Sequence, residues 1–211
     1  MAKKKTFVDW NEALKPLFKK YKGRKHPLQY ENAYQLIVMI VLSARASDLL
    51  VNNLAPELFK KYTTVKHLAK AKQAELYPLL RVPGFRKKAE WIVDIAQTLG
   101  QLPEIPTTID ELTTLKGFGR KSANVYMSQI GLTAEGVIVD LHTLRVSPRL
   151  GIAEGTDPKK IEQQLMANID KKNWHILGMS LTYLGRETCR PTNPKCPECV
   201  MNSVCDFFNK K

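Results

Sequence analysis

Two sets of residues in this chain have types and spacing suited to chemistry: a basic glycine turn and a group of four cysteines. The turn lies within residues 115–125, which read Leu-Lys-Gly-Phe-Gly-Arg-Lys-Ser-Ala-Asn-Val. Gly117 and Gly119 permit a sharp turn, with no Cβ to keep another chain away. Arg120 and Lys121 follow at the expected start of a helix, where free N–H groups and the positive dipole end suit a phosphate oxygen. The pattern predicts a grip on a nucleic-acid backbone.

A second interpretation of the glycines is a simple tight connection, since short motifs of this kind often match by chance. Helical sequence flanks the turn on both sides. Thr108 and Glu111 have capping-box spacing before it. Ala123 and Met127 recur at a helical interval after it. The sequence therefore predicts a helix, a glycine hairpin and a second helix.

All four cysteines lie close together near the C-terminus, separated by six, two and five residues. They are Cys189, Cys196, Cys199 and Cys205. This spacing excludes a disulfide framework that spans the chain, and it allows four thiolates to converge on one metal centre. The alternative is four free buried thiols. From spacing alone, zinc and an iron–sulfur cluster are equally open.

Composition points to a folded protein with an anionic partner. Hydrophobic residues make up 44% of the 211, enough for a core, and the formal net charge is +13. Nucleic acid ranks ahead of a membrane as the partner, because no long apolar segment or lipidation signal is present. The N-terminal residues 1–5 lack the apolar stretch of a signal peptide, so we expect a cytoplasmic protein with no membrane association.

Helical patterns run through the chain, with no convincing alternation typical of strands. Pro16 is expected to kink or delay a helix within residues 9–22. Residues 36–42 are apolar all round, which predicts a buried central helix. Either Ser47 or Asp48 then suits the N-cap of the next helix. Further helices are expected near 64–71, 73–80, 157–169 and 174–186. The fold class is therefore all-α.

Three further positions carry candidate functional side chains. Arg45 follows the buried helix directly, so we expect it to have a partner or an outlet to the surface. Phe85, in a second basic glycine turn, is interpreted either as an aromatic wedge that enters a base stack or as an ordinary core residue. Asp140 sits where an N-cap belongs, so structure alone explains it equally well.

Taken together, these features resemble the endonuclease III branch of the helix-hairpin-helix DNA glycosylases. The matching segments are residues 115–125, Val139-Asp140-x-His142, Leu184-Gly185-Arg186 and the spacing of the four cysteines. The resemblance implies an all-α protein of two lobes with DNA in the cleft between them. One lobe is a six-helix domain from 25 to 136, and the other combines 1–24 with 137–211.

The resemblance also implies a cofactor and a chemistry. The cysteines would hold a 4Fe-4S cluster, and the cluster loop, with Arg190 and Lys195, would face the phosphate backbone. The enzyme would flip a damaged nucleotide out of the duplex, and Lys121 would attack C1′ to expel the base. β-Elimination from the resulting Schiff base would cut the strand 3′ to the lesion. Asp140 would stabilise the developing positive charge, while cationic neighbours and partial burial would favour the deprotonated lysine.

Departures from the family pattern bear on the substrate. Lys116 replaces the usual hairpin proline, Arg45 replaces a common glutamine, and Leu141 replaces a threonine. Oxidised pyrimidines are the family default, with uracil, mismatched thymine or another lesion as alternatives. The expected partner is double-stranded DNA with a damaged base or abasic site, bound by a monomer. The expected DNA contacts are Gly117, Gly119, Arg120, Arg45, Phe85, Arg86, Lys87, His142, Arg190 and Lys195.

Two readings from other classes compete with this one. In the first the protein is a non-catalytic DNA-binding module, in which Lys121 contacts a phosphate and Asp140 only caps a helix. In the second it is a zinc-stabilised interaction protein.

Overall fold

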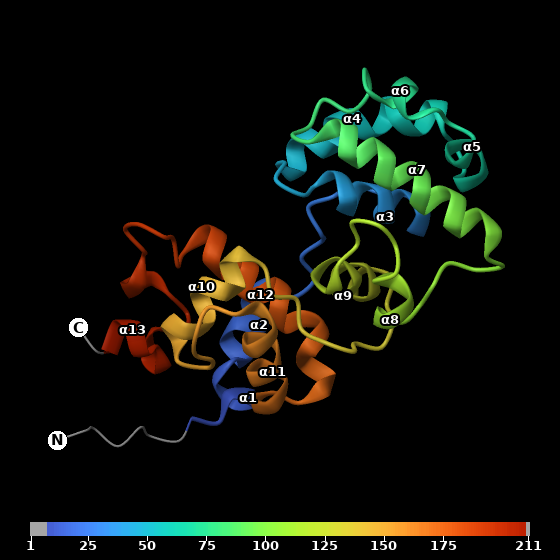
Figure 1. Ribbon diagram of the computed structural model, residues 1–211. Coiled ribbons are helices and arrows are strands. Elements are labelled where there is room, and N and C mark those ends of the chain that lie inside the picture. Colours follow the sequence, from blue (N-terminus) through green and yellow to red (C-terminus); the bar gives the residue numbers. More distant parts are fainter. Residues whose placement is uncertain (1–7, 210–211) are drawn as a thin grey trace. The chain divides into compact units, whose positions relative to one another are not determined.

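The computed structural model describes residues 8–209, which form helices and connecting turns with no strand among them (Figure 1). The predicted all-α class is confirmed. The chain divides into two compact units, residues 25–132 and residues 1–24 with 133–211. The second boundary falls at 132/133, where the sequence suggested 136/137. The basic residues 3–5 lie outside the described part of the chain.

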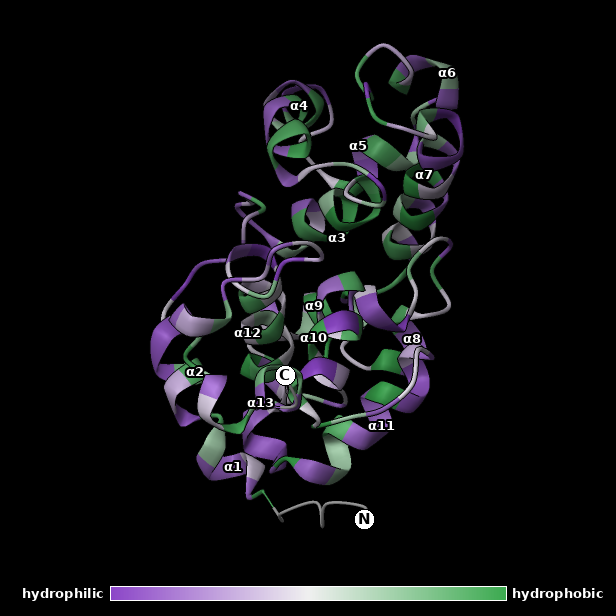
Figure 2. Ribbon diagram, turned by 90° about the vertical axis from the view of Figure 1, so that its left-hand side faces the viewer, coloured by the Kyte–Doolittle hydropathy of each residue, from purple (hydrophilic) through white to green (hydrophobic). Residues whose placement is uncertain are grey.

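The unit of residues 25–132 is built around one buried helix. Its helices are α3 (Ala33–Leu42), α4 (Asp48–Lys61), α5 (Val65–Ala69), α6 (Gln73–Leu76), α7 (Phe85–Gln101), α8 (Ile109–Leu112) and α9 (Arg120–Gln129). Every side chain of residues 36–42 is at most 5% exposed, as predicted, and α3 contacts α4, α7 and α9. Helix α3 is accordingly largely green in the hydropathy view (Figure 2).

Two local signals in this unit act as predicted. Ser47 is the N-cap of α4, where its hydroxyl accepts a hydrogen bond from the N–H of Leu50 at 3.2 Å. Thr108 caps α8 by accepting from the N–H of Glu111 at 3.3 Å, and its hydroxyl donates to the Glu111 carboxylate at 2.8 Å. These caps fix where α4 begins, directly after the turn that carries Arg45, and where α8 begins, ahead of the glycine hairpin.

The second unit packs α2, α10, α11 and α12 around its own core. Its helices are α1 (Trp10–Ala13), α2 (Lys15–Tyr21), α10 (Leu141–Leu150), α11 (Pro158–Asn168), α12 (Trp174–Glu187) and α13 (Asp206–Asn209). The helix predicted over residues 9–22 is interrupted at Leu14, and Pro16 falls in the first turn of α2. This is where the missing N–H of a proline costs nothing.

Two glycines of α12 let this helix approach the segment that carries Asp140. A Cβ on Gly178 would lie 2.6 Å from the Ile138 Cβ, and one on Gly185 would lie 2.7 Å from the His142 Cβ. Neither position has room for a larger residue. The close packing of α10 against α12 therefore depends on these glycines.

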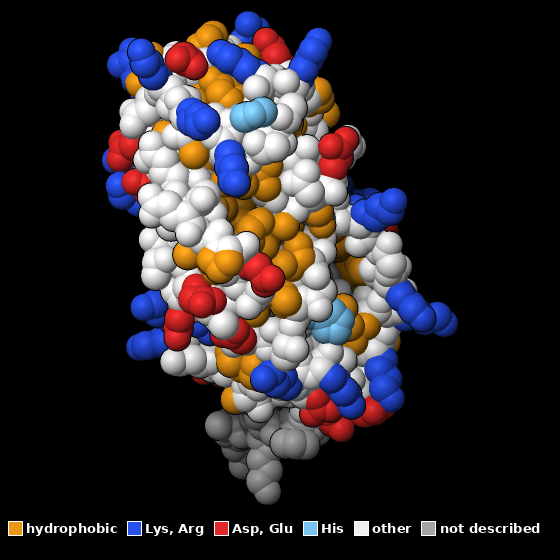
Figure 3. Space-filling model, turned by 90° about the vertical axis from the view of Figure 1, so that its right-hand side faces the viewer, with side chains coloured by type: hydrophobic (Ala, Val, Ile, Leu, Met, Phe, Trp, Pro, Cys, Tyr) orange, Lys and Arg blue, Asp and Glu red, His pale blue; other side chains and the backbone are white. Residues whose placement is uncertain are grey.

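Cationic side chains are spread over the protein surface. On the face drawn in Figure 3, Lys and Arg side chains stand out among hydrophobic and acidic ones. Between residues 8 and 209, no helix has the length and apolar character needed to cross a membrane.

Candidate DNA-binding site and metal centre

The two glycines of the hairpin have different structural roles. Gly117 has φ +75°, and a Cβ there would lie 2.4 Å from the Cε3 atom of Trp91. The close approach at Gly117 therefore comes from the protein's own indole ring rather than from another chain. Gly119 has φ −84°, and a Cβ there would meet nothing within 4 Å. The open side at Gly119 is the one that leaves room for a ligand.

Helix α9 begins at this open glycine. Gly119 is the N-cap, and no side chain caps the first turn. Phe118 packs the turn against the core: its side chain is 1% exposed, and its ring lies edge-on to Tyr126, with 6.4 Å between centroids. Arg120 and Lys121 occupy the first two helical positions, and both side chains are exposed. A helix N-terminus with two exposed cations is suited to bind an anion.

The expected partial burial of Lys121 is wrong. Its side chain is exposed because the second position of α9 faces away from the core, which this helix meets from Ala123 onward. The amine therefore lies at the surface of the unit that carries it.

Arg45 has the surface outlet that was expected for it. Its side chain is exposed, makes no hydrogen bond with any described residue, and its backbone has φ +56°. Few non-glycine residues adopt this left-handed conformation, which costs about 1–2 kcal/mol. The turn that follows α3 therefore presents an arginine in a strained backbone.

The second glycine turn opens α7 and only partly matches its predictions. Phe85 is half-buried, with its ring edge-on to Tyr77 at 5.4 Å between centroids, so it is neither a fully buried core residue nor a projecting wedge. Arg86 is exposed, with its guanidinium 5.7 Å from the Phe85 ring centroid. Lys87 is exposed and bonds both carboxylate oxygens of Glu90 at 2.8 and 2.9 Å. This turn offers cations rather than an apolar wedge.

Asp140 is the N-cap of α10, as predicted. Its Oδ1 accepts hydrogen bonds from the N–H groups of His142 at 2.9 Å and Thr143 at 2.8 Å. Its Oδ2 accepts none from the described residues. The cap thus fixes the orientation of a half-buried carboxylate and leaves one oxygen for another partner.

The ring of His142 is held by Arg145. The His142 Nδ1 lies 3.2 Å from the Arg145 Nη2, and because a guanidinium only donates, Nδ1 accepts and Nε2 carries the proton of the neutral ring. Burial lowers the pKa of His142, with Arg145 and Arg186 acting in the same direction and Asp140 opposing them. The ring is therefore kept neutral, with Nε2–H as its remaining donor.

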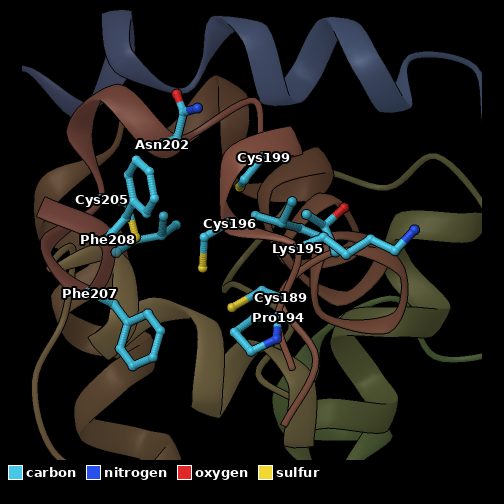
Figure 4. Close-up of a pocket in the computed structure, with 12 residues that line it drawn as sticks. Cys189, Pro194, Lys195, Cys196, Cys199, Asn202, Cys205, Phe207 and Phe208 are labelled. Atoms are coloured by element: carbon cyan, nitrogen blue, oxygen red, sulfur yellow. The ribbon is translucent and has the colours of Figure 1, made fainter. Parts of the chain in front are cut away.

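The four cysteines border one cavity. They are Cys189, Cys196, Cys199 and Cys205, all free thiols, placed around a small pocket that is partly open to solvent (Figure 4). Leu150, Leu184, Phe207 and Phe208 form apolar walls. The donor set and its enclosure fit a cysteine-ligated cluster.

Among residues 8–209, no three His, Cys, Asp or Glu side chains are grouped so as to hold one metal ion. Burial raises the pKa of the Cys199 and Cys205 thiols, and the neighbouring cysteines add to the shift. Ligation would therefore have to displace their protons.

Two arginines of α10 that no local pattern in the sequence marks hold the cysteine loop in place. Arg149 donates to the carbonyls of Arg190 at 2.7 Å and Pro191 at 3.1 Å, and its Nη1 lies 3.6 Å from the Cys189 Sγ. Arg145 donates to the Cys189 carbonyl at 3.2 Å. The loop is thus tied to the helix that Asp140 caps.

The two cations expected on the cysteine loop are at the surface. Arg190 and Lys195 both have exposed side chains, and the Lys195 Nζ lies 3.7 Å from a Glu198 carboxylate oxygen. An exposed ion pair of this length holds its partners weakly. Both cations are therefore free to reorient toward an anion.

Comparison with known proteins gives consistent matches. Residues 38–171 match the model of the HhH-GPD superfamily of base excision DNA repair proteins. The chain is 36% identical over 197 residues to endonuclease III of Synechocystis sp., covering 92% of this chain and 90% of that protein. It is 34% identical over 181 residues to endonuclease III of Thermotoga maritima, covering 84% of each.

Solved structures agree with the sequence matches. The fold superposes on the structure of a trapped endonuclease III–DNA covalent intermediate with a TM-score of 0.85 and 32% identity. The match covers 94% of this chain and 95% of that one.

Proposed function

The chain belongs to the endonuclease III family within the HhH-GPD superfamily and is a base-excision DNA glycosylase and AP lyase, and from this premise we propose that Lys121 is its nucleophile. The observation that carries the proposal is the position of this lysine. Lys121 is exposed at the second residue of α9, beside Arg120 and next to the open Gly119. A strand whose phosphate sits on this helix end brings its sugar within reach of the amine.

The reaction follows from that placement. The lone pair of the Lys121 Nζ attacks C1′, the glycosidic bond breaks, and its electron pair leaves with the base, which takes up a proton. The nitrogen then loses one proton, and its lone pair breaks the C1′–O4′ bond, whose electron pair goes to O4′ and takes up a proton, so that C1′ becomes a protonated Schiff base. Loss of a proton from C2′ then expels the 3′ phosphate, which cuts the strand, and water releases the lysine.

Asp140 is proposed as the second catalytic residue. Its carboxylate is oriented by two backbone N–H groups and keeps one oxygen available. A fixed negative charge of this kind stabilises positive charge that develops on the sugar, and it is able to accept a proton from the lysine. His142, neutral and oriented by Arg145, is proposed to donate from Nε2 to the DNA.

Covalent trapping tests the nucleophile. Borohydride added during turnover of an abasic duplex should link the protein to DNA, and Lys121→Ala should abolish the link while binding survives. Lys116→Ala is the matched control, because Lys116 lies in the same turn but is paired with Asp94 at 2.6 Å. Trapping that persists in Lys121→Ala, or is lost in Lys116→Ala, would remove Lys121 from this role.

For the substrate we propose oxidised pyrimidines in double-stranded DNA, with uracil or mismatched thymine as the alternative. A panel of duplexes that each carry a single lesion or an abasic site decides between them. Arg45 is proposed to contact the base opposite the lesion, on the ground of its exposure and its lack of a partner among the described residues. An opposite-base preference that Arg45→Gln leaves unchanged would contradict this assignment.

We further propose that Cys189, Cys196, Cys199 and Cys205 hold a 4Fe-4S cluster. When bound, the cluster would position the loop that carries Arg190 and Lys195 and is capable of one-electron redox chemistry. Purified protein should be brown and contain iron, whereas a zinc protein would be colourless. We propose that the protein acts as a monomer in the cytoplasm, which size-exclusion chromatography and cell fractionation would test.

A further inference from the structure

Lys88 is the only buried lysine or arginine between residues 8 and 209, with 4% of its surface exposed. Its Nζ donates hydrogen bonds to the carbonyl of Leu42 at 2.9 Å and to that of Ala44 at 2.5 Å. Burial lowers the pKa of this amine. Burying a lysine is unfavourable unless its charge is compensated, so these two bonds largely define the role of the side chain.

The carbonyls that Lys88 binds belong to the turn between α3 and α4. Leu42 is the last residue of α3, where carbonyls lack helical partners and the dipole is negative, so an ammonium is a suitable cap. Ala44 immediately precedes Arg45, whose φ is +56°. A non-glycine residue keeps such a conformation only when its surroundings over-determine it. Lys88 supplies that constraint on the N-terminal side of Arg45.

The hydrogen bonds of Lys88 also connect two segments that carry separate candidate residues in the sequence: the start of α7 and the turn of Arg45. Lys88 is the fourth residue of α7, and the exposed Arg86 and Lys87 precede it on the same helical turn. Its ammonium reaches the turn that presents Arg45, and Leu49, at the start of α4, is 70% exposed. The buried Lys88 amine therefore connects the start of α7, with its two exposed cations, to the turn that presents Arg45 and leads to the exposed Leu49.

We propose that Lys88 is a positioning residue, which locks the turn of residues 42–47 so that Arg45 and the start of α7 act as one DNA-contacting surface. This inference rests on the proposed function of Arg45. A purely structural lysine would lower the stability of the unit without any specific effect on Arg45. The two roles are therefore separable by experiment.

A double-mutant cycle tests the proposal. Binding to a reduced abasic duplex, which has no aldehyde and cannot be cut, is measured for wild type, Arg45→Ala, Lys88→Met and the double variant. Loss of the arginine contact should weaken binding about tenfold, the effect of roughly 1.4 kcal/mol. Lys88→Met should lose a similar factor, and the double variant should bind no more weakly than either single one.

Ile95→Ala provides the matched control, because Ile95 is a core residue of the same helix with 1% exposure and no part in the turn. It should lower the melting temperature but leave DNA affinity unchanged in the folded protein. Losses that multiply in the double variant, or an equal loss of affinity in Ile95→Ala, would overturn the proposal.

Limited trypsin digestion gives a local readout. Trypsin cleaves after Arg45, so the rate at the Arg45–Ala46 bond, followed by mass spectrometry, reports how firmly the turn is held. Cleavage there should be several-fold faster in Lys88→Met, and in Lys88→Gln if the methionine variant does not fold, but not in Ile95→Ala. An unchanged rate would contradict the inference.

The two proposals fail in different ways. If wild-type protein cuts abasic DNA while Arg45 and Lys88 show no coupling, the positioning role is wrong and the proposed mechanism stands. If coupling is seen but borohydride traps nothing, the mechanism is wrong and the shared surface remains.

Discussion

The two basic glycine turns of residues 25–132 have similar sequences but place their lysines in opposite environments. Gly84 caps α7 with φ +70°, and Lys88 is the fourth residue of that helix, buried. Gly119 caps α9 with φ −84°, and Lys121 is its second residue, exposed. The fourth residue of α9 is Ala123, which is 0% exposed. The position in the first helical turn, rather than the residue type, decides whether a lysine anchors the fold or meets a ligand.

The phenylalanines of the two turns differ in the same way. Phe118 precedes its helix and is 1% exposed, whereas Phe85 is the first residue of its helix and is half-buried against Tyr77. The turn before α9 is thus held in place by its own buried side chain, Phe118. The α7 turn is instead joined to a neighbouring turn by Lys88.

Moving the lysine by one helical position should have the largest effect. The paired change Lys121→Ser with Ser122→Lys keeps composition and net charge but rotates the amine by about 100° around α9. Because misplacement by about 1 Å already costs on the order of 10²-fold, borohydride trapping should be abolished while DNA binding is kept. Trapping at the wild-type level would mean that position within this turn is unimportant.

Removing the phenylalanine ring should lower the free energy of unfolding by different amounts in the two turns. Phe118→Ala should lower the free energy of unfolding by about 3–5 kcal/mol, because it empties a fully buried site. Phe85→Ala should cost about 1–2 kcal/mol, since the ring is already half exposed. Urea denaturation measures both values. Equal losses would show that Phe85 is as much a core residue as Phe118.

Alanine substitutions at the glycines should fall in a definite order. Gly117→Ala combines a positive φ with a clash against Trp91 and should cost about 2–4 kcal/mol. Gly84→Ala, with a positive φ but open space, should cost about 1–2 kcal/mol. Gly119→Ala should cost less than about 1 kcal/mol. The Gly119→Ala variant should nevertheless bind DNA more weakly if the DNA strand approaches the backbone at this glycine. A large stability loss at Gly119 would mean that it too is needed by the fold.

Alkaline pH should change the contributions of Lys88 and Lys116 to the free energy of unfolding in opposite directions, which is a smaller effect. Burial lowers the pKa of Lys88 below its ordinary 10.5, so between the lowered pKa and 10.5 the unfolded chain binds more protons and stability rises with pH. The hydrogen bond and charge of Asp94 raise the pKa of Lys116, so its contribution is complete below pH 10.5 and is lost as pH rises through the raised pKa.

Unfolding free energies of wild type, Lys88→Met and Lys116→Met from pH 7 to 11 check this contrast. The difference between wild type and Lys88→Met should grow toward pH 10.5, while that for Lys116→Met should stay level over the same range and then shrink. A level difference for Lys88→Met would contradict the burial of a charged amine.

Much of the fold was predictable because the signals are local. The apolar run of residues 36–42 predicts a buried helix, and Ser47 and Asp140 cap the helices that follow them. Caps and periodicity act within a few residues of the chain, so the sequence displays them directly. The four cysteines were predicted to converge for a similar reason, since the loop between Cys189 and Cys205 is short.

Local patterns decide less where the environment depends on distant residues. The Lys121 side chain is exposed where partial burial is predicted, and the half-buried Phe85 packs against Tyr77, which leaves both interpretations of this residue open. Lys88 lies four residues before Ile92, on the buried face of α7, but a lysine on such a face becomes understandable only through the distant carbonyls that it binds.

By itself, the sequence determined the helical class, the helix starts, the hairpin with its lysine and the cysteine spacing, because these depend on neighbours along the chain. Only the tertiary structure decided that the Trp91 ring packs where a Cβ on Gly117 would lie. It also decided that the Lys88 amine binds a carbonyl at the end of α3. Those contacts join residues far apart in the chain. Their energies come from desolvation and close packing, which no single segment encodes.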